Sequence, residues 1–167
     1  MVRAAYRGRS PLWRAKAWAV IGLSGLCVVL YTIVEAKQLM QALPVGIWAA
    51  PAASVGYFRE MPRAISLAGL YGILFVLRLV TVWNVAGLIL CISGWCKQIS
   101  VGQGAAVILF GVPAFLGYVG VAGMQIVSPA GAMSGWMLFE TGIGFWAYGL
   151  WMILGLAGWI AARRRWT

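Results

Sequence analysis

The strongest constraint on the fold is a run of 22 uncharged residues, Thr141 to Ala162, which lies between Glu140 and the cluster Arg163–Arg165. An α-helix rises about 1.5 Å per residue, so the run would cover roughly 30 Å, the thickness of the hydrocarbon core of a bilayer. Arginine clusters resist transfer across a membrane and accumulate on its cytoplasmic side. The run therefore predicts a transmembrane helix whose C-terminal end lies at the cytoplasmic face.

The composition extends this prediction to the whole chain. Of the 167 residues, 63% are hydrophobic and 10% are charged, whereas a soluble domain has about 25% charged residues. We therefore predict an all-α, polytopic integral membrane protein with a single membrane domain over residues 1–167. The net charge of +10 comes from Lys and Arg at the ends of apolar runs. We interpret it as a topology signal that also attracts the anionic lipids of the bilayer, and we expect no nucleic-acid binding.

A second apolar run lies near the N-terminus. The first 16 residues contain five basic and no acidic side chains, and 17 uncharged residues follow from Trp18 to Val34. A secretory signal peptide has a similar basic start, and the segment 34–36 resembles a cleavage site, but the apolar region of a signal peptide usually has only about 7–15 residues. We therefore favour an uncleaved first transmembrane helix with the N-terminus inside.

The next apolar segment, residues 39–58, is interrupted by Pro44 and Pro51, which break helical continuity. Its aromatic residues are of types that gather at membrane–water interfaces. We predict a re-entrant or surface segment on the outer side. A full span is the alternative, but a fifth crossing would move Arg163–Arg165 to the outside.

The segment between Arg63 and Lys97 contains a single charged residue, Arg78. Two spans would need about 40 residues, so the segment crosses the membrane once. One arrangement is a long tilted helix that carries Arg78 within the membrane. The other is an interfacial helix over 65–77 followed by a short span over 79–95.

A further span is predicted around Pro113, where a kink is expected, and a tight outer turn follows it over 128–134. The four predicted spans are residues 17–34, 72–95, 105–127 and 141–162. Four crossings place both termini on one side, with nine Lys and Arg residues on that side and three opposite. This bias predicts cytoplasmic termini, and we expect a bacterial plasma (inner) membrane as the location.

Four polar residues form the candidate intramembrane polar site: Arg78, Asn84, Gln125 and Glu140. On this threading Arg78 and Glu140 lie at similar depth in the outer half of the membrane and could form an ion pair that lines a polar entry. The alternative is that both reach the outer interface and any pairing fixes only the helix register. For Asn84 and Gln125, interhelical hydrogen bonds are the simpler explanation.

Small residues predict the helix-packing faces. Gly117, Gly120 and Gly123 recur every third residue along the third span, and Ala68 and Gly72 make a small-xxx-small pair. In lipid, small residues let helices approach closely. The faces serve packing within the bundle or docking of other integral membrane proteins, or of further copies of this chain.

The chain has few residues that could act in catalysis or bind a cofactor. The chain has no histidine and three acids, so we expect no metal, no bound cofactor and no catalytic site. Cys91 and Cys96 are five residues apart, which is not the spacing of a redox pair. We also expect the compartment that Cys96 faces to be reducing, which favours free thiols.

These features favour a non-enzymatic role, as a small structural or assembly subunit of a larger membrane complex. The alternative is a small oligomeric transporter or channel with its path near Arg78, Asn84 and Glu140. A membrane enzyme that acts on lipid is a weaker third hypothesis, because the chain has few groups that could supply acid–base catalysis.

Overall fold

The protein is a bundle of helices, seen here in a computed structural model. The structure describes residues 2–42, 45–54, 59, 64–96, 99–121, 123–124, 128–134 and 142–166. Three of the described helical stretches are long and apolar enough to cross a membrane: Pro11–Gln41, Leu67–Trp95 and Ser100–Tyr118. The predicted all-helical architecture is therefore confirmed, and three such helices indicate a multi-pass membrane protein.

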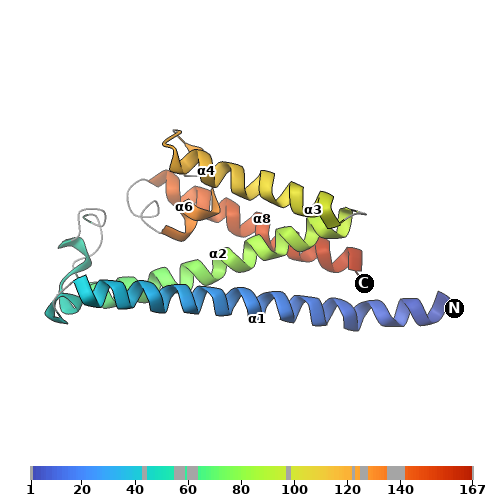
Figure 1. Ribbon diagram of the computed structural model, residues 1–167, viewed down its shortest axis with the longest axis horizontal. Coiled ribbons are helices and arrows are strands. Elements are labelled where there is room, and N and C mark those ends of the chain that lie inside the picture. The colour runs from blue at the N-terminus through green and yellow to red at the C-terminus, as the bar shows by residue number, and fades with distance from the viewer. Residues whose placement is uncertain are drawn as a thin grey trace.

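The first helix, α1 (Val2–Ala42), is far longer than the predicted span 17–34. Its 41 residues correspond to about 60 Å, roughly twice the thickness of a bilayer core. The helix continues into the basic arm because Arg, Ala, Leu and Lys, which favour helix, dominate that arm. In Figure 1 the N-terminal part of α1 extends past the ends of the other helices.

Two short 3₁₀ helices, η1 (Val45–Ala49) and η2 (Ala52–Ser54), follow α1. Two backbone hydrogen bonds fasten them to the approach to α2: Ala52 N to Ile65 O at 2.7 Å, and Leu67 N to Ala50 O at 2.9 Å. The described part of the segment 39–58 thus holds the end of α1 and these short turns.

The second helix, α2 (Leu67–Trp95), is unbroken over 29 residues and carries Arg78. The Ser66 hydroxyl caps its start by accepting a hydrogen bond from the Gly69 amide at 3.2 Å. Of the two arrangements open from the sequence, the long helix is therefore the one observed.

The third stretch is one irregular helix made of α3 (Ile99–Ala106), the π-helical turn η4 (Val107–Gly111) and α4 (Val112–Tyr118). The Val112 amide donates to the Val107 carbonyl, five residues back. The irregularity thus lies directly before Pro113, which has no amide proton to give. The helix begins and ends earlier than the predicted span 105–127.

The chain closes with the short helix α6 (Pro129–Ser134), in place of the predicted tight turn, and the long helix α8 (Gly142–Trp166). α8 runs in the same direction as α2 and packs along it, while α1 lies on another side of α2 (Figure 1). The two termini lie at the same end of the molecule.

The close approach of α2 and α8 depends on three glycines, Gly87 on α2 and Gly155 and Gly158 on α8. A Cβ atom at Gly87 would overlap the Trp159 ring, and one at Gly155 would overlap Asn84. A Cβ at Gly158 would lie 3.1 Å from the backbone of Leu88. These three glycines bring the two helix backbones together.

The predicted packing residues lie elsewhere. Ala68 and Gly72 are exposed, and a Cβ at Gly72 would meet nothing within 4 Å. Gly117 is buried in the last turn of α4, but Gly120 and Gly123 have φ of +91° and +80°. This left-handed conformation, which glycine adopts readily, ends the helix. Of these three glycines only Gly117 thus lies on the helix, and Gly120 and Gly123 follow its end.

Candidate intramembrane polar site

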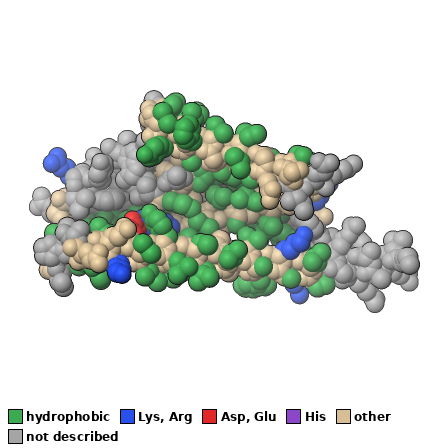
Figure 2. Space-filling model, in the orientation of Figure 1, with side chains coloured by type: hydrophobic (Ala, Val, Ile, Leu, Met, Phe, Trp, Pro, Cys, Tyr) green, Lys and Arg blue, Asp and Glu red, His purple; other side chains and the backbone are tan. Residues whose placement is uncertain are grey.

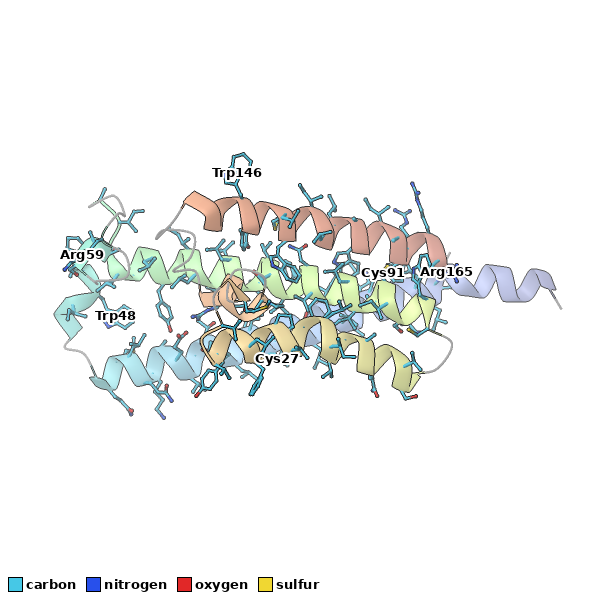
Figure 3. The ribbon with its side chains drawn as sticks, turned by 90° about the horizontal axis from the view of Figure 1, so that it is seen from above. Cys27, Trp48, Arg59, Cys91, Trp146 and Arg165 are labelled. Atoms are coloured by element: carbon cyan, nitrogen blue, oxygen red, sulfur yellow. The ribbon has the colours of Figure 1, made fainter. Side chains whose placement is uncertain are left out.

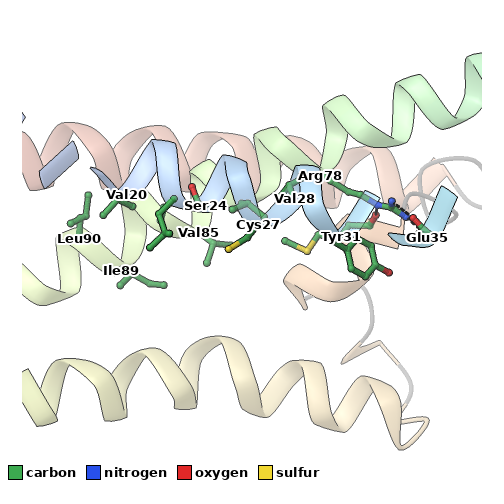
Figure 4. A pocket seen from close by; sticks show the side chains of 14 residues that line it. Val20, Ser24, Cys27, Val28, Tyr31, Glu35, Arg78, Val85, Ile89 and Leu90 are labelled. Atoms are coloured by element: carbon green, nitrogen blue, oxygen red, sulfur yellow. Dashed lines mark hydrogen bonds and ion pairs between the residues drawn. The ribbon is translucent and has the colours of Figure 1, made fainter. Parts of the chain in front are cut away.

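Arg78 joins three helices near the middle of α2. Its side chain is buried, and its guanidinium forms a two-pronged ion pair with the Glu35 carboxylate of α1. Nη1 donates to Oε2, and Nη2 donates to Oε1 at 3.1 Å. Nε donates to the carbonyl oxygen of Met133, in α6, at 3.3 Å. Figure 4 shows the paired side chains at one end of a pocket.

Each partner has a physical reason to meet this arginine. The last carbonyls of a helix have no intrahelical donor, and Met133 is the penultimate residue of α6. One N–H group of Arg78 donates to this carbonyl, while two others donate to the Glu35 carboxylate and balance its charge. A lone arginine at the centre of a membrane helix costs about 2.5–3.5 kcal/mol on insertion scales. The neighbouring carboxylate removes the net charge from this position.

Aromatic rings surround the charged pair. The guanidinium carbon of Arg78 lies 5.2 Å from the centre of the Tyr31 ring and 6.0 Å from that of Tyr71. At these distances the ring faces attract the cation. The Tyr71 ring also meets Trp48 edge-on, with centroids 5.8 Å apart, which links the site to the 3₁₀ turn η1.

The buried hydroxyl of Tyr71 makes no hydrogen bond to any described residue. It lies close to the Glu35 carboxylate, which already holds the two Arg78 N–H groups. A buried polar atom without a partner is unfavourable. The Tyr71 oxygen lies beside both charged side chains of the pair, which are its nearest polar groups for a hydrogen bond.

A long pocket of about 900 Å³ extends from the ion pair along α1 and α2. Figure 2 shows the hollow in the bundle, lined by hydrophobic atoms. On α1 the lining residues recur at helical spacing, among them Val20, Cys27 and Tyr31. On α2, Val82 and Ile89 are among the residues that supply the opposite wall. The pocket is thus apolar along its length and polar at the end where Arg78 and Glu35 meet.

The residues of the predicted polar site do not gather in one place. Asn84 faces α8, where its amide nitrogen lies 3.0 Å from the sulfur of Met152, so it joins two helices and lies away from the Arg78 side chain. Gln125 and Glu140 fall outside the described residues. The predicted pairing of Arg78 with Glu140 is therefore not described, and the carboxylate found on Arg78 is that of Glu35.

The sequence contains one signal for Glu35. Residues 20, 24, 27, 31 and 35 follow one another at intervals of three or four, so Glu35 continues the same face of α1 as the apolar residues before it. An acid on the inward face of a membrane helix requires a basic partner, and Arg78 is the charged residue within the next helix.

The cysteines form no disulfide and lie at different places. Cys27 is exposed and lines the pocket, whereas Cys91 and Cys96 are partly buried near the far end of α2. Figure 3 shows Cys91 toward the end of the bundle where Arg165 lies, with Trp48 and Arg59 at the opposite end.

Comparisons with known proteins give no match to a family, to a curated protein or to a solved structure.

Proposed function

We propose that this protein is a small structural or assembly subunit of a larger membrane complex. The observation that carries this proposal is how little of two spans the chain itself covers. In the most apolar windows of Pro11–Gln41 and Ser100–Tyr118 only 6% of the residues are buried, against 33% in Leu67–Trp95. α2 is a central helix with neighbours around it, and the two outer helices present long faces to lipid or to other proteins.

The polar side chains within the bundle support a structural role. The Trp159 indole donates to the carbonyl of Trp83 at 2.8 Å, and the Tyr148 hydroxyl donates to that of Leu77 at 3.2 Å. Arg78 similarly joins α1, α2 and α6. Each of these groups holds one helix to the next, as polar groups between membrane helices commonly do.

A transporter or channel is the second candidate, and the pocket favours it less. A path for ions or polar solutes needs polar groups along its length. Beyond the Arg78–Glu35 pair the pocket is lined mainly by apolar side chains, its Ser24 hydroxyl donates to the Ile21 carbonyl of its own helix, and Glu35 neutralises Arg78. Asn84, which the transport hypothesis needs beside Arg78, contacts α8.

The proposed threading has α8 as a fourth span, and the segment 39–58 lies at the outer surface. Arg165 supports a common level for the ends of α2 and α8, because its Nε lies 3.4 Å from the Gly94 carbonyl oxygen and its guanidinium lies 5.1 Å from the centre of the Trp95 ring. With the basic N-terminal arm at the same end, the positive-inside rule places both termini in the cytoplasm, in a bacterial plasma membrane on our hypothesis.

Reporter fusions test this threading. A cytoplasm-active reporter fused after Thr167 or before Met1 should be active at both ends, and a periplasm-active reporter at neither, because four crossings return the chain to its starting side. A reporter inserted after Ser54 should give the opposite result. Activity of the two terminal fusions in opposite compartments would contradict the four-span threading.

Photo-crosslinking tests the subunit proposal. A photoreactive phenylalanine analogue at Ile108 or Phe115, both about 65% exposed, should crosslink to one or more distinct membrane proteins in intact cells, because these positions lie on the outward face of the third helix. The same analogue at the buried Leu74 is the matched control and should give only intramolecular products. Crosslinks that join only copies of this chain, together with a defined homo-oligomer, would favour the transporter.

A further inference from the structure

We propose that the pocket between α1 and α2 binds an amphiphile that has an uncharged polar head and a single long hydrocarbon tail. The head would lie at the Arg78–Glu35 pair, and the tail would lie along the apolar walls. The pocket opens to the outside of the bundle, because Leu23 and Tyr31 in its lining are 67% and 59% exposed, so an occupant can enter it from the bilayer. The inference does not depend on the proposed subunit role.

The shape of the pocket fits such a molecule. From Val20 to Glu35 the lining residues of α1 cover 15 helical steps, or roughly 22 Å, which is comparable with an extended long acyl chain. The volume of about 900 Å³ is near the upper end of the range of roughly 300–1,000 Å³ for ligand pockets. The opposite wall on α2 extends from Arg78 to Leu90, which is 12 helical steps or roughly 18 Å, and its lining residues from Val82 onward are apolar.

The polar end indicates an uncharged head with hydrogen-bond acceptors. Arg78 has five N–H donors, and described acceptors on Glu35 and Met133 take three of them. The remaining two can donate to a carbonyl or hydroxyl oxygen. Because the Arg78–Glu35 pair already balances its charges, it offers little net attraction to a charged head, which would lose its hydration without compensation.

Two classes of molecule share this chemistry: glycerides with one acyl chain, and quinones with an alkyl tail. Both have uncharged oxygen acceptors at one end and hydrocarbon at the other. A phospholipid of the surrounding bilayer differs, because its head is ionised and remains at the interface. The pocket thus discriminates by the charge of the head and by the presence of a tail.

Cys27 provides a direct measurement, because its thiol is exposed and lines the middle of the pocket. In a Cys91→Ser/Cys96→Ser protein in phosphatidylcholine nanodiscs, N-ethylmaleimide should alkylate Cys27 at a measurable rate. Monoolein or decylubiquinone, added at ten times its Kd, should slow that rate about tenfold, because a bound tail covers the thiol in proportion to occupancy. The two probes distinguish a glyceride from a quinone as the occupant.

A charged probe with the same tail tests the head. Lysophosphatidate with an oleoyl chain differs from monoolein by its phosphate, and it should leave the Cys27 rate unchanged. A thiol on the opposite face of α1 tests for general effects of the lipid: Val29→Cys, made in a Cys27→Ser background, lies about 200° around the helix from position 27 and should not be protected.

A filled pocket gives a second measurement. The Cys27→Trp protein should no longer retain radiolabelled monoolein or quinone. The Val29→Trp protein should still retain the ligand, and the melting temperatures of the two variants should be equal. The proposal is overturned if neither uncharged probe protects Cys27, if lysophosphatidate protects it equally, or if Val29→Cys is protected to the same extent. The proposal would also be overturned if a copurifying protein covers Cys27. It would equally be overturned if the Cys27→Trp protein still retains both uncharged ligands.

Discussion

Glu35→Gln should destabilise the folded protein by about 2–3 kcal/mol, less than the roughly 3–5 kcal/mol for a fully buried ion pair that loses one partner, because the Glu35 side chain is 28% exposed. The substitution keeps the size of the side chain but leaves the buried Arg78 guanidinium without its counter-charge. Arg78→Gln should have a similar effect, and it also removes the donor to the Met133 carbonyl. The measurement is the free energy of unfolding in mixed detergent micelles, obtained by SDS titration and followed by tryptophan fluorescence.

The double substitution Glu35→Leu/Arg78→Met distinguishes a charge effect from a packing effect. Removing both charges together leaves no uncompensated ion, so the double variant should be much closer to the unmodified protein than either single variant. A charge exchange, Glu35→Arg/Arg78→Glu, should recover part of the stability that each single reversal loses. If the double neutral variant is as unstable as the single variants, the ion pair does not explain the effect.

Glu140→Gln is the matched control, because it neutralises a different acid by the same chemical change. With Glu35 on Arg78, this substitution should change the free energy of unfolding by less than about 0.5 kcal/mol, as is usual away from such features. A loss at Glu140 equal to the loss at Glu35 would contradict the pairing described above and favour the pair that the sequence alone suggested.

The helical membrane architecture could be predicted because it depends on summed properties of long segments. The length of an apolar run and its lack of charge are properties of one segment and do not depend on which helix packs against it. They located α2 and the start of the third helix approximately. Helix ends were predicted less well. α1 continues far into the basic arm, because helix propensity does not change where hydropathy changes. The third helix ends at Tyr118 because Gly120 takes a positive φ.

The site could be predicted only in part. The sequence identified Arg78, since a charge inside a membrane helix needs an explanation. It does not identify Glu35, because this residue directly follows the uncharged run Trp18 to Val34 and lies near Lys37, so it has the position of a charge at the end of a span. The contribution of Met133 could not be predicted at all, because a backbone carbonyl carries no sequence signal and α6 is a short helix whose position depends on tertiary packing.

The packing glycines also could not be predicted from local sequence alone. Gly72 and Gly87 lie on the same helix among uncharged residues, yet a Cβ at Gly72 would meet nothing within 4 Å and one at Gly87 would overlap Trp159. Spacing indicates which small residues share a face, but only the position of α8 determines which face is covered. A substitution at Gly87 therefore tests the arrangement of α2 and α8 directly.

Gly87→Ala should destabilise the protein by about 1–3 kcal/mol, the usual range for overpacking. The new methyl group would overlap the Trp159 ring, and that ring cannot move aside easily. Its indole N–H donates to the Trp83 carbonyl at 2.8 Å, and its ring meets Trp13 edge-on with centroids 6.0 Å apart. The two helices must then separate, and the contacts along α2 and α8 weaken. SDS titration, as for the ion pair, measures the loss.

Gly72→Ala is the matched control on the same helix, and it should leave stability unchanged or raise it slightly, because the added methyl meets nothing within 4 Å and alanine favours helix over glycine. A double-mutant cycle with Trp159→Leu isolates the contact. Loss of the indole has its own cost, but Gly87→Ala should cost less in the Trp159→Leu background, by a coupling of about 0.5–3 kcal/mol. Equal costs in both backgrounds would mean that Gly87 does not face Trp159, and the parallel packing of α2 on α8 in this register would then be wrong.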